Sequence, residues 1–281
     1  MEYMNVDCYN CKSNKNTFYS SENGYNLVKC NGCGLLFVNP RPSENMIEAA
    51  HKLGVHQGIE KLEMTGVFDN TKTSNYLKIL EDIFGKQINL KEKVWLDIGC
   101  GHGEFLAALK KFSNEEIKVK GLEPNIYKQK SAQKRGLDVS FFDLEKHTCT
   151  YDFISFLNVY SHLPNPIDSI LSWKRLLKPG GRLLLETGNT ANLNSKDHYK
   201  PFLLPDHLSF ASESIVVNIL KKSGFEIINI KKYPFVKCNL KYITKEIIKL
   251  LLPNKKSLLK YVIKHKKYAD TDMYIQSRLK T

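Results

Sequence analysis

The spacing of apolar residues divides the chain into a short strand-rich start and a body in which strands and helices alternate. Apolar side chains recur at helical intervals over residues 71–86, and a continuous apolar run over 94–98 predicts a buried strand. Further strands are expected at 117–123, 138–142, 152–157 and 182–186, with helices at 104–111, 125–135 and 166–177. This alternation predicts an α/β fold, a mainly parallel sheet with helices on both faces.

The first strand of the body runs directly into a glycine-rich loop. Gly99, Gly101 and Gly103 allow the backbone to approach a bound ligand closely. A dinucleotide-binding fingerprint would need Gly or Ala at position 104, where Glu104 stands instead. The carboxylate of Asp97, just before the loop, attracts an ammonium group and repels a pyrophosphate. We therefore expect a ligand that carries a positive amine.

Polar residues also follow the other predicted parallel strands. Glu123 ends the second strand, where the ribose diol is held in related sheets. Asp143 and Asn158 follow the third and fourth strands. Because ligands of open α/β sheets bind beyond the carboxyl ends of the strands, we expect these side chains to border one crevice.

These motifs resemble those of the class I S-adenosylmethionine-dependent methyltransferases. The resemblance covers about residues 70–230 and rests on Leu96-Asp-Ile-Gly-Cys-Gly-His-Gly103, Gly121-Leu-Glu-Pro124 and Leu176-Leu-Lys-Pro-Gly-Gly181. It implies a Rossmann-like methyltransferase sheet with S-adenosylmethionine as the cofactor. The cofactor-binding residues that it implies are Asp97 near the amine, Gly99, Cys100 and Gly101 along the methionine part, Glu123 and Pro124 at the ribose, Asp143 and Leu144 at the adenine, and Asn158 under the sulfonium.

Four cysteines near the start of the chain have the spacing of a zinc ribbon. Cys8 and Cys11 precede Cys30 and Cys33 in the pattern C-x2-C-x18-C-x2-C. Two short strands are expected between the pairs, joined by a turn at Asn23-Gly24. Four thiolates complete a tetrahedron around Zn²⁺ and leave no position for water or substrate, so the expected zinc is structural.

Two histidines lie where a base would help methyl transfer. A hydroxyl is a poor nucleophile at neutral pH, so a histidine close to the transferred methyl group would help to remove the proton. His207 follows the fifth strand, with Asp206 beside it to orient the ring, and His162 follows the fourth strand. We expect His207, Asp206 and His162 to form the catalytic centre, with a hydrogen-bonded structural role for each histidine as the alternative.

A narrower resemblance concerns the acceptor of the methyl group. The ribbon, Cys33-Gly-Leu-Leu-Phe-Val-Asn-Pro-Arg-Pro42 and Pro205-Asp-His-Leu-Ser-Phe-Ala-Ser212 look like zinc-ribbon methyltransferases that act on nucleotide-linked sugars of bacterial capsule, other surface-polysaccharide and deoxysugar pathways. In sugar C-methyltransferases of that group, the histidine matching His207 serves the chemistry. Those enzymes carry a long further C-terminal domain, and this chain has only a basic tail. The expected acceptor is therefore a sugar hydroxyl, with carbon methylation as the alternative.

Charge is concentrated at the C-terminal end. Of the net charge of +13, residues 221–281 contribute +12, from sixteen Lys or Arg and four Asp or Glu. Such a segment is either a solvated surface or the partner of an anion. The amphipathic stretch 241–267 could contact an anionic membrane surface. An RNA or protein methyltransferase that grips a macromolecule is a further alternative, but nucleic acid is not expected because Asn158-Val-Tyr-Ser-His162 lacks an Asn/Asp-Pro-Pro-Tyr motif.

These observations divide the 281 residues into four expected regions. They are a zinc ribbon (1–42), a helical linker over the cofactor (43–92), the methyltransferase core (93–235) and a basic C-terminal extension (236–281). The sequence contains no apolar run long enough for a membrane span, and its polar start does not read as a secretory signal. We therefore expect a cytoplasmic location. The sequence does not specify the sugar, the hydroxyl, the nucleotide or the oligomeric state.

Overall fold

A seven-stranded sheet forms the centre of the molecule. The structure, a computed structural model, describes residues 3–86, 88–143, 147–234 and 271–280. Five strands run parallel, and the two at one edge complete the sheet in antiparallel pairing. In spatial order the strands are β10 (Val139–Ser140), β9 (Lys118–Leu122), β8 (Val94–Ile98), β11 (Tyr151–Leu157), β12 (Leu177–Gly188), β15 (Asp272–Leu279) and β14 (Phe225–Tyr233).

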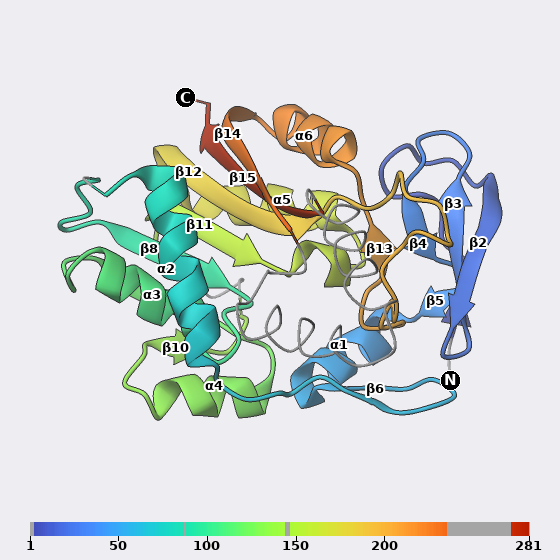
Figure 1. The fold of residues 1–281 in the computed structure, drawn as a ribbon, viewed down its shortest axis with the longest axis horizontal. Helices are drawn as coiled ribbons and strands as arrows, with labels where there is room; N and C mark the ends of the chain where they lie inside the picture. The colour runs from blue at the N-terminus through green and yellow to red at the C-terminus, as the bar shows by residue number, and fades with distance from the viewer. Residues whose placement is uncertain (1–2, 87, 144–146, 235–270, 281) are drawn as a thin grey trace, which may run out of the picture.

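Helices cover both faces of this sheet because its central strands carry apolar side chains on both sides (Figure 1). In β11, Phe153 packs with the helices of one face and its neighbour Ile154 with those of the other. Helices α2 (Asn70–Phe84) and α3 (Glu104–Phe112) cover the first face. The second face carries α5 (Pro166–Trp173), the 3₁₀ turn η2 (Lys174–Leu176) and α6 (Glu213–Lys222), and α4 (Ile126–Gln133) lies beside β10. The predicted α/β class with helices on both faces is confirmed.

The last strand of the sheet comes from a segment that the sequence analysis assigned to the basic extension. β15 inserts between β12 and β14 and pairs antiparallel with both. Met273 and Ile275 pack into the core on one face, and Tyr274 packs on the other. The core therefore does not end at residue 235 as predicted. The amphipathic stretch 241–267 lies outside the described residues.

One boundary inside the core also differs from the prediction. The helix expected over 166–177 ends at Trp173, and β12 begins at Leu177 rather than at residue 182. Leu177 pairs with Tyr151, and a bulge follows before regular pairing resumes at Phe153 and Arg182. The Pro-Gly-Gly sequence thus forms an irregularity within a strand rather than a free turn.

The N-terminal segment forms a second, four-stranded sheet. β2 (Asn16–Glu22) and β3 (Tyr25–Cys30) make the expected hairpin, and β4 (Leu36–Val38) extends it. The fourth strand, β13 (Ser209–Phe210), comes from the segment between β12 and α6 and pairs with β4. A small pairing of β1 (Tyr3–Met4) with β5 (Arg41–Pro42) lies beside this sheet. The predicted ribbon therefore shares a strand with the core.

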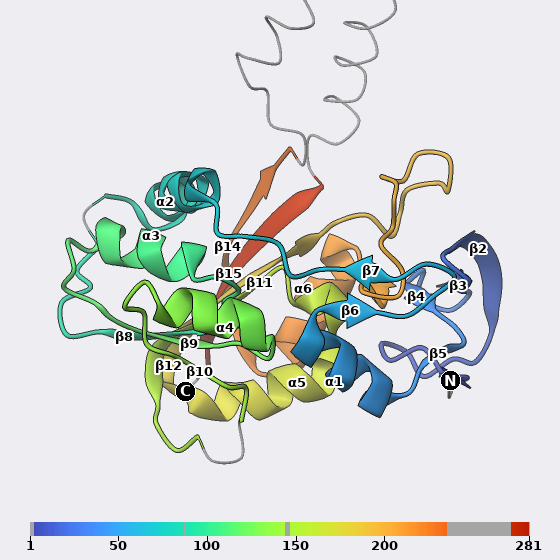
Figure 2. The same ribbon diagram turned by 90° about the horizontal axis from the view of Figure 1, so that it is seen from below.

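A connecting segment joins the two sheets. It contains α1 (Glu44–Leu53) and the paired strands β6 (Val55–His56) and β7 (Leu62–Glu63). Figures 1 and 2 show α1 between the N-terminal sheet and α4. Gly54 ends α1 with a left-handed backbone, φ 71°, which turns the chain into β6. Among the described residues, no helix combines the length and apolar character that crossing a bilayer requires.

Candidate active site

A cavity of about 710 Å³ opens at the carboxyl ends of the parallel strands. The glycine loop and the end of β9 line one part of it, and α1, β6 and the 3₁₀ turn η1 (Tyr160–His162) line another. Of the predicted cofactor-binding residues, the following line the cavity: Asp97, Gly99, Cys100, Gly101, Glu123, Pro124 and Asn158. One continuous pocket therefore brings together most of the side chains that the sequence placed at strand ends.

The glycine loop needs residues without side chains for two reasons. Gly99 has a left-handed backbone with φ 70°, and a Cβ there would lie 2.5 Å from Cγ2 of Val159. Gly103 has φ 90°, and a Cβ would lie 2.3 Å from Cδ1 of Leu137. The loop consequently brings the backbone close to the cavity floor and starts α3 at Glu104.

Asp97 is a buried carboxyl group at this floor. It is 2% exposed and accepts a hydrogen bond of 2.6 Å from Oγ of Ser155, which in turn accepts one of 2.9 Å from Nε1 of Trp95. Burial raises the pKa of Asp97 to about 8, with the hydrogen bond of Ser155 opposing the shift and the charge of Glu123 adding to it. A cationic group of a ligand would therefore restore the charged carboxylate.

Glu123 is tied to the glycine loop by backbone amides. Its Oε2 accepts a hydrogen bond of 2.7 Å from the N–H of Gly101, and its Oε1 accepts one of 2.9 Å from the N–H of Asn125. Burial raises the pKa of Glu123, and these two amides oppose the shift. The carboxylate is thus held rigidly at the end of β9, next to Pro124.

Of the described cofactor-binding residues predicted after the third and fourth strands, only one lines the cavity. Asn158 lines the cavity with a left-handed backbone, φ 56°. Asp143 is not among the lining residues, and its N–H donates a hydrogen bond of 2.9 Å to the carbonyl of Phe141. Leu144 lies outside the described residues. Phe141 and Phe142 line the cavity instead, and the aromatic pair at the end of this predicted strand was the sequence signal for them.

His162 and Asp206 meet at the rim of the cavity, and both line it. Nδ1 of His162 lies 2.9 Å from the backbone carbonyl oxygen of Asp206 and 3.2 Å from its Oδ1. Because a carbonyl oxygen can only accept, Nδ1 carries the proton and Nε2 keeps the lone pair. Burial opposes protonation of His162, but the Asp206 carboxylate outweighs it and raises the pKa of His162.

His207 occupies a different position from the one expected for a catalytic group. It is not among the residues that line the cavity, and its ring packs against that of His162 with centroids 4.6 Å apart. Burial and the neighbouring His162 lower the pKa of His207 to about 3, so the ring is neutral at physiological pH. The catalytic role predicted for His207 stays a prediction.

Two further histidines on this rim were not singled out by the sequence analysis. His51, on the last turn of α1, and His56, on β6, both line the cavity. Nε2 of His56 lies 3.0 Å from Oδ1 of Asp206. Burial, together with His162 and His56, lowers the pKa of His51 to about 4. Neither histidine belongs to a contiguous motif, so no pattern in the sequence indicated them.

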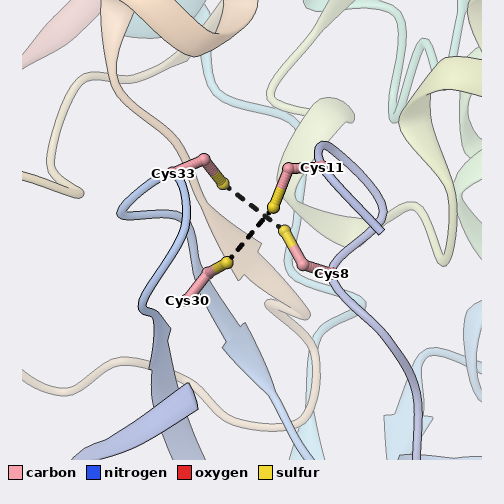
Figure 3. Close-up of side chains that lie close together, drawn as sticks. All are labelled: Cys8, Cys11, Cys30 and Cys33. Atoms are coloured by element: carbon pink, nitrogen blue, oxygen red, sulfur yellow. Dashed lines mark hydrogen bonds between the residues drawn. The ribbon is translucent and has the colours of Figure 1, made fainter. Parts of the chain in front are cut away.

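The four predicted zinc ligands converge on one point (Figure 3). Sγ of Cys8 lies 3.5 Å from Sγ of Cys33, and Sγ of Cys11 lies 3.4 Å from Sγ of Cys30. A tetrahedral zinc with Zn–S bonds of about 2.3 Å would separate neighbouring sulfurs by about 3.8 Å. The donor set and its compactness fit that ion, with a small expansion of the cluster.

The cysteine cluster (Cys8, Cys11, Cys30 and Cys33) is anchored to the core. Cys8 and Cys30 belong to the main apolar core. The hydroxyl of Tyr9 lies 3.2 Å from that of Tyr160 and 3.3 Å from Oγ of Ser209. Tyr160 belongs to η1 and Ser209 to β13, and the N–H of Leu208, just before β13, donates a hydrogen bond of 2.7 Å to the carbonyl of Ser161 in η1. The cysteine cluster therefore packs against the same two elements, η1 and β13, that position His162 and Asp206 at the rim of the cavity.

Comparisons with known proteins agree with this fold. A family model described as a methyltransferase domain matches residues 70–230. A ubiquinone biosynthesis O-methyltransferase of Roseobacter denitrificans is 24% identical over 162 residues, 50% of this chain and 62% of that protein. One of Coxiella burnetii is 34% identical over 110 residues, 37% of this chain and 47% of that protein.

The chain thus spans about half the length of the curated relatives that it matches. The crystal structure of a SAM-dependent methyltransferase from Archaeoglobus fulgidus shares the fold, with a TM-score of 0.53 and 19% identity, and the match covers 73% of this chain and 94% of that one. With the family model matching residues 70–230, the chain belongs to the methyltransferase domain family.

Proposed function

We propose that the protein transfers a methyl group from S-adenosylmethionine to a hydroxyl group of a small molecule, a nucleotide-linked sugar. One observation carries the proposal. A single cavity is bordered on one part by the glycine loop with Asp97 and Glu123, and on another by His162, which is held by Asp206. The first part suits the cofactor, and the second suits an acceptor that must lose a proton.

The cofactor half of the cavity has the charge that S-adenosylmethionine requires. Asp97 would face its ammonium group, and Glu123 would accept hydrogen bonds from the ribose hydroxyls. Phe141 and Phe142 offer apolar surface for the adenine ring. The match of the family model over residues 70–230 supports this use of the pocket.

The acceptor half offers a base. We assign the role to His162 rather than to His207, because His162 lines the cavity and keeps its Nε2 lone pair free. S-adenosylmethionine supplies an activated methyl group: its carbon–sulfur bond breaks as the carbon–oxygen bond to the acceptor forms, and neutral S-adenosylhomocysteine results. Nε2 of His162 takes the hydroxyl proton, and the Asp206 carboxylate stabilises the imidazolium that results.

A nucleotide sugar is supported by the cationic groups of the same cavity. Lys52, Lys72 and Lys128 line it, and lysine is a common point charge for a phosphate group. The acidic side chains of Glu44, Glu48 and Asp168 also line the cavity and are acceptors for sugar hydroxyls. The ubiquinone O-methyltransferase relatives support oxygen as the acceptor atom.

The test is a screen of nucleotide sugars with S-adenosylmethionine, read by mass spectrometry. A product that gains one methyl group, and that is lost with the His162→Ala variant, supports the proposal. If the protein methylates none of the sugars but methylates a phenol or a catechol, the acceptor class is overturned and the transfer chemistry is kept. If S-adenosylmethionine does not bind at all in calorimetry, the whole proposal fails.

We also propose that the cysteine cluster holds a structural Zn²⁺. Four thiolates leave no open coordination position, so the ion would stabilise the fold and take no part in the transfer. Purified protein should retain zinc that the Cys30→Ser variant lacks, together with a large loss of stability. The Cys149→Ser variant, which changes an exposed cysteine, is the matched control. A metal-free wild-type protein of unchanged stability would contradict the assignment.

A further inference from the structure

A second group of metal-ligand side chains lies at the rim of the cavity, apart from the cysteine cluster. His51 comes from the end of α1, His56 from β6, and Asp206 from the loop before β13. One ligand atom from each of the three lies within 4.8 Å of the other two. The proposed transfer step uses neither His51 nor His56, so their convergence needs another explanation.

The distances within this group suit a first-row divalent cation. Nε2 of His56 lies 3.0 Å from Oδ1 of Asp206. Adjacent ligands at about 2.1 Å from an octahedral metal are separated by about 3.0 Å. The ring centroid of His51 lies 5.6 Å from that of His56. Two imidazoles and one carboxylate form the ligand set that leaves open positions on Fe²⁺ and similar ions.

An orphaned nitrogen points to the same conclusion. Nε2 of His51 is buried and has no hydrogen-bond partner among the described residues. A buried polar atom without a partner is destabilising, and a metal ion would satisfy it. His198 also carries a buried nitrogen without a partner, but it packs among Tyr19, Phe202 and Phe210 with no carboxylate beside it. Nδ1 of His207 is a third buried nitrogen without a partner among the described residues, and it lies in the neighbouring set with His162 and Asp206. The His51 nitrogen therefore differs from that of His198 by lying in a set with a second imidazole and an acid.

The charge around Asp206 is also consistent with a bound cation. Asp206 is 5% exposed. Among the described residues its ion-pair partners are the imidazoles of His56 and His162, and no lysine or arginine pairs with it. Burial of a carboxylate is costly unless its charge is compensated, and here two imidazoles compensate it. A divalent cation in place of the His56 proton would compensate the same charge.

Hydrogen bonding separates this set from the neighbouring one. His162, Asp206 and His207 form a second compact group. However, Nδ1 of His162 donates its proton to the backbone carbonyl of Asp206, so that nitrogen has no lone pair for a metal. Among the described residues, Nε2 of His56 donates only to the Asp206 carboxylate, and a cation bound by both groups would take the place of that proton. His162 can therefore serve as the base while Asp206 also contributes an oxygen to the neighbouring set.

We propose that His51, His56 and Asp206 bind a divalent transition-metal cation, Fe²⁺, Zn²⁺ or Mn²⁺, with open coordination positions toward the cavity. The binding site is independent of the proposed function, because the three ligands form it whatever the acceptor is. Its use rests on the proposed function: the cation would bind the acceptor oxygen and lower the pKa of the hydroxyl before His162 removes the proton.

Cobalt binding tests the site without any turnover. Protein is produced in zinc-depleted medium supplied with Co²⁺, so that the cysteine cluster is filled as the chain folds. It is then titrated with further Co²⁺, with no S-adenosylmethionine or acceptor present, and visible and near-ultraviolet absorption is recorded. We expect two Co²⁺ per chain in the wild type. One gives the thiolate charge-transfer bands of the cysteine cluster, and the second gives weak bands without a sulfur contribution. His51→Ala and His56→Ala should each bind one Co²⁺ and keep the thiolate bands.

Two controls make the result decisive. The His198→Ala variant removes a buried histidine outside the set and should still bind two Co²⁺. Should His51→Ala fold poorly, His51→Asn and circular dichroism of each variant separate loss of the site from loss of the fold. The proposal is overturned if the wild type binds one Co²⁺ with thiolate bands only, or if the His51 and His56 variants still bind two. Failure here would leave the acceptor screen unaffected.

Discussion

The two halves of the cavity are built in different ways. The half that we propose for the cofactor, here called the cofactor half, comes from β8, the loop from Gly99 to Gly103, and Glu123 at the end of the neighbouring strand β9. The acceptor half is assembled from α1, β6, η1 and the loop before β13. The first half is stabilised by the pairing of β8 with β9, which follow one another in the sequence. The second half depends on the pairing of β13 with β4, which lie far apart in the sequence.

This difference determines how each half responds to change. In the cofactor half, the binding surface is formed by the backbone of the glycines and by two carboxylates. Single substitutions there should therefore lower the affinity for S-adenosylmethionine before they affect the transfer step. In the acceptor half, Asp206 depends on β13, which pairs with β4 of the N-terminal sheet. Substitutions far from the cavity can therefore alter turnover while cofactor binding is kept.

The strongest separation of the two halves is expected from His162→Ala. Loss of the proposed base should lower turnover by ~10²-fold or more, with affinity for S-adenosylmethionine changed by less than ~3-fold. Steady-state kinetics and calorimetry on the same preparation measure both. The matched control is His198→Ala, another buried histidine, which should keep turnover per folded molecule. Near-normal turnover of His162→Ala would move the base to His207 or to solvent.

Asp97→Asn should produce the opposite pattern. Losing the buried charge that faces the ammonium group should weaken S-adenosylmethionine binding by ~10- to 100-fold, about 1–3 kcal/mol. Asp152→Asn is a suitable control, because Asp152 lies at the amino end of β11, whereas the cavity lies at the carboxyl ends of the strands, and because it pairs with Lys93 and Lys178. Equal loss of affinity in both variants would show a general effect on the fold rather than a contact with the cofactor.

The raised pKa of Asp97 predicts a pH dependence of cofactor binding. With its pKa at about 8 in the ligand-free protein, Asp97 is mostly neutral below that pH. A cationic ligand favours the carboxylate, so binding should release a proton, and affinity should rise by up to ~10-fold per pH unit between about pH 6 and 7.5. Calorimetry in buffers of different ionisation enthalpy counts the proton. Asp97→Asn should remove the dependence, and a flat wild-type profile would contradict this prediction.

The smallest effect is expected from Glu22→Gln, which tests the support of the acceptor half. The Glu22 carboxylate accepts hydrogen bonds from the N–H groups of Phe202 (2.7 Å), Leu203 (2.6 Å) and Leu204 (3.3 Å), just before Asp206. The variant should lose about 1 kcal/mol of unfolding free energy and turn over a few-fold more slowly. Denaturant titration and kinetics measure these changes, with exposed Glu63→Gln as the control. Weaker cofactor binding in Glu22→Gln would contradict the view that the two halves respond separately to substitutions.

Sequence patterns predicted the regions where function depends on neighbouring residues. Short apolar runs predicted the five parallel strands, and the glycine loop with Asp97 and Glu123 predicted the half of the cavity that we propose for the cofactor. These predictions were possible because the residues concerned belong to single strands and to the loops directly after them. His51 and His56 could not be found in this way. They contact or approach Asp206 only because α1 and β6 lie against a loop about 150 residues further on in the sequence. A contact between such distant segments leaves no local spacing pattern in the sequence.

The C-terminal strand was missed for a related reason. Residues 272–279 contain only a three-residue apolar run, Met273 to Ile275, and they follow a long stretch rich in lysine, so the charge decided the prediction. Their partners, β12 and β14, determine that they form a strand. Pairing between distant segments therefore accounts for both omissions.

The position of β15 has a practical consequence for anyone who shortens this protein. Because β15 lies between β12 and β14, removing everything after residue 234 would leave β14 without its hydrogen-bonding partner. The loss of Met273 would also leave a cavity in the apolar core. A shortened version therefore has to keep residues 272–279 together with the two strands that they join. An affinity handle placed after β15 needs a spacer so that it does not disturb this pairing.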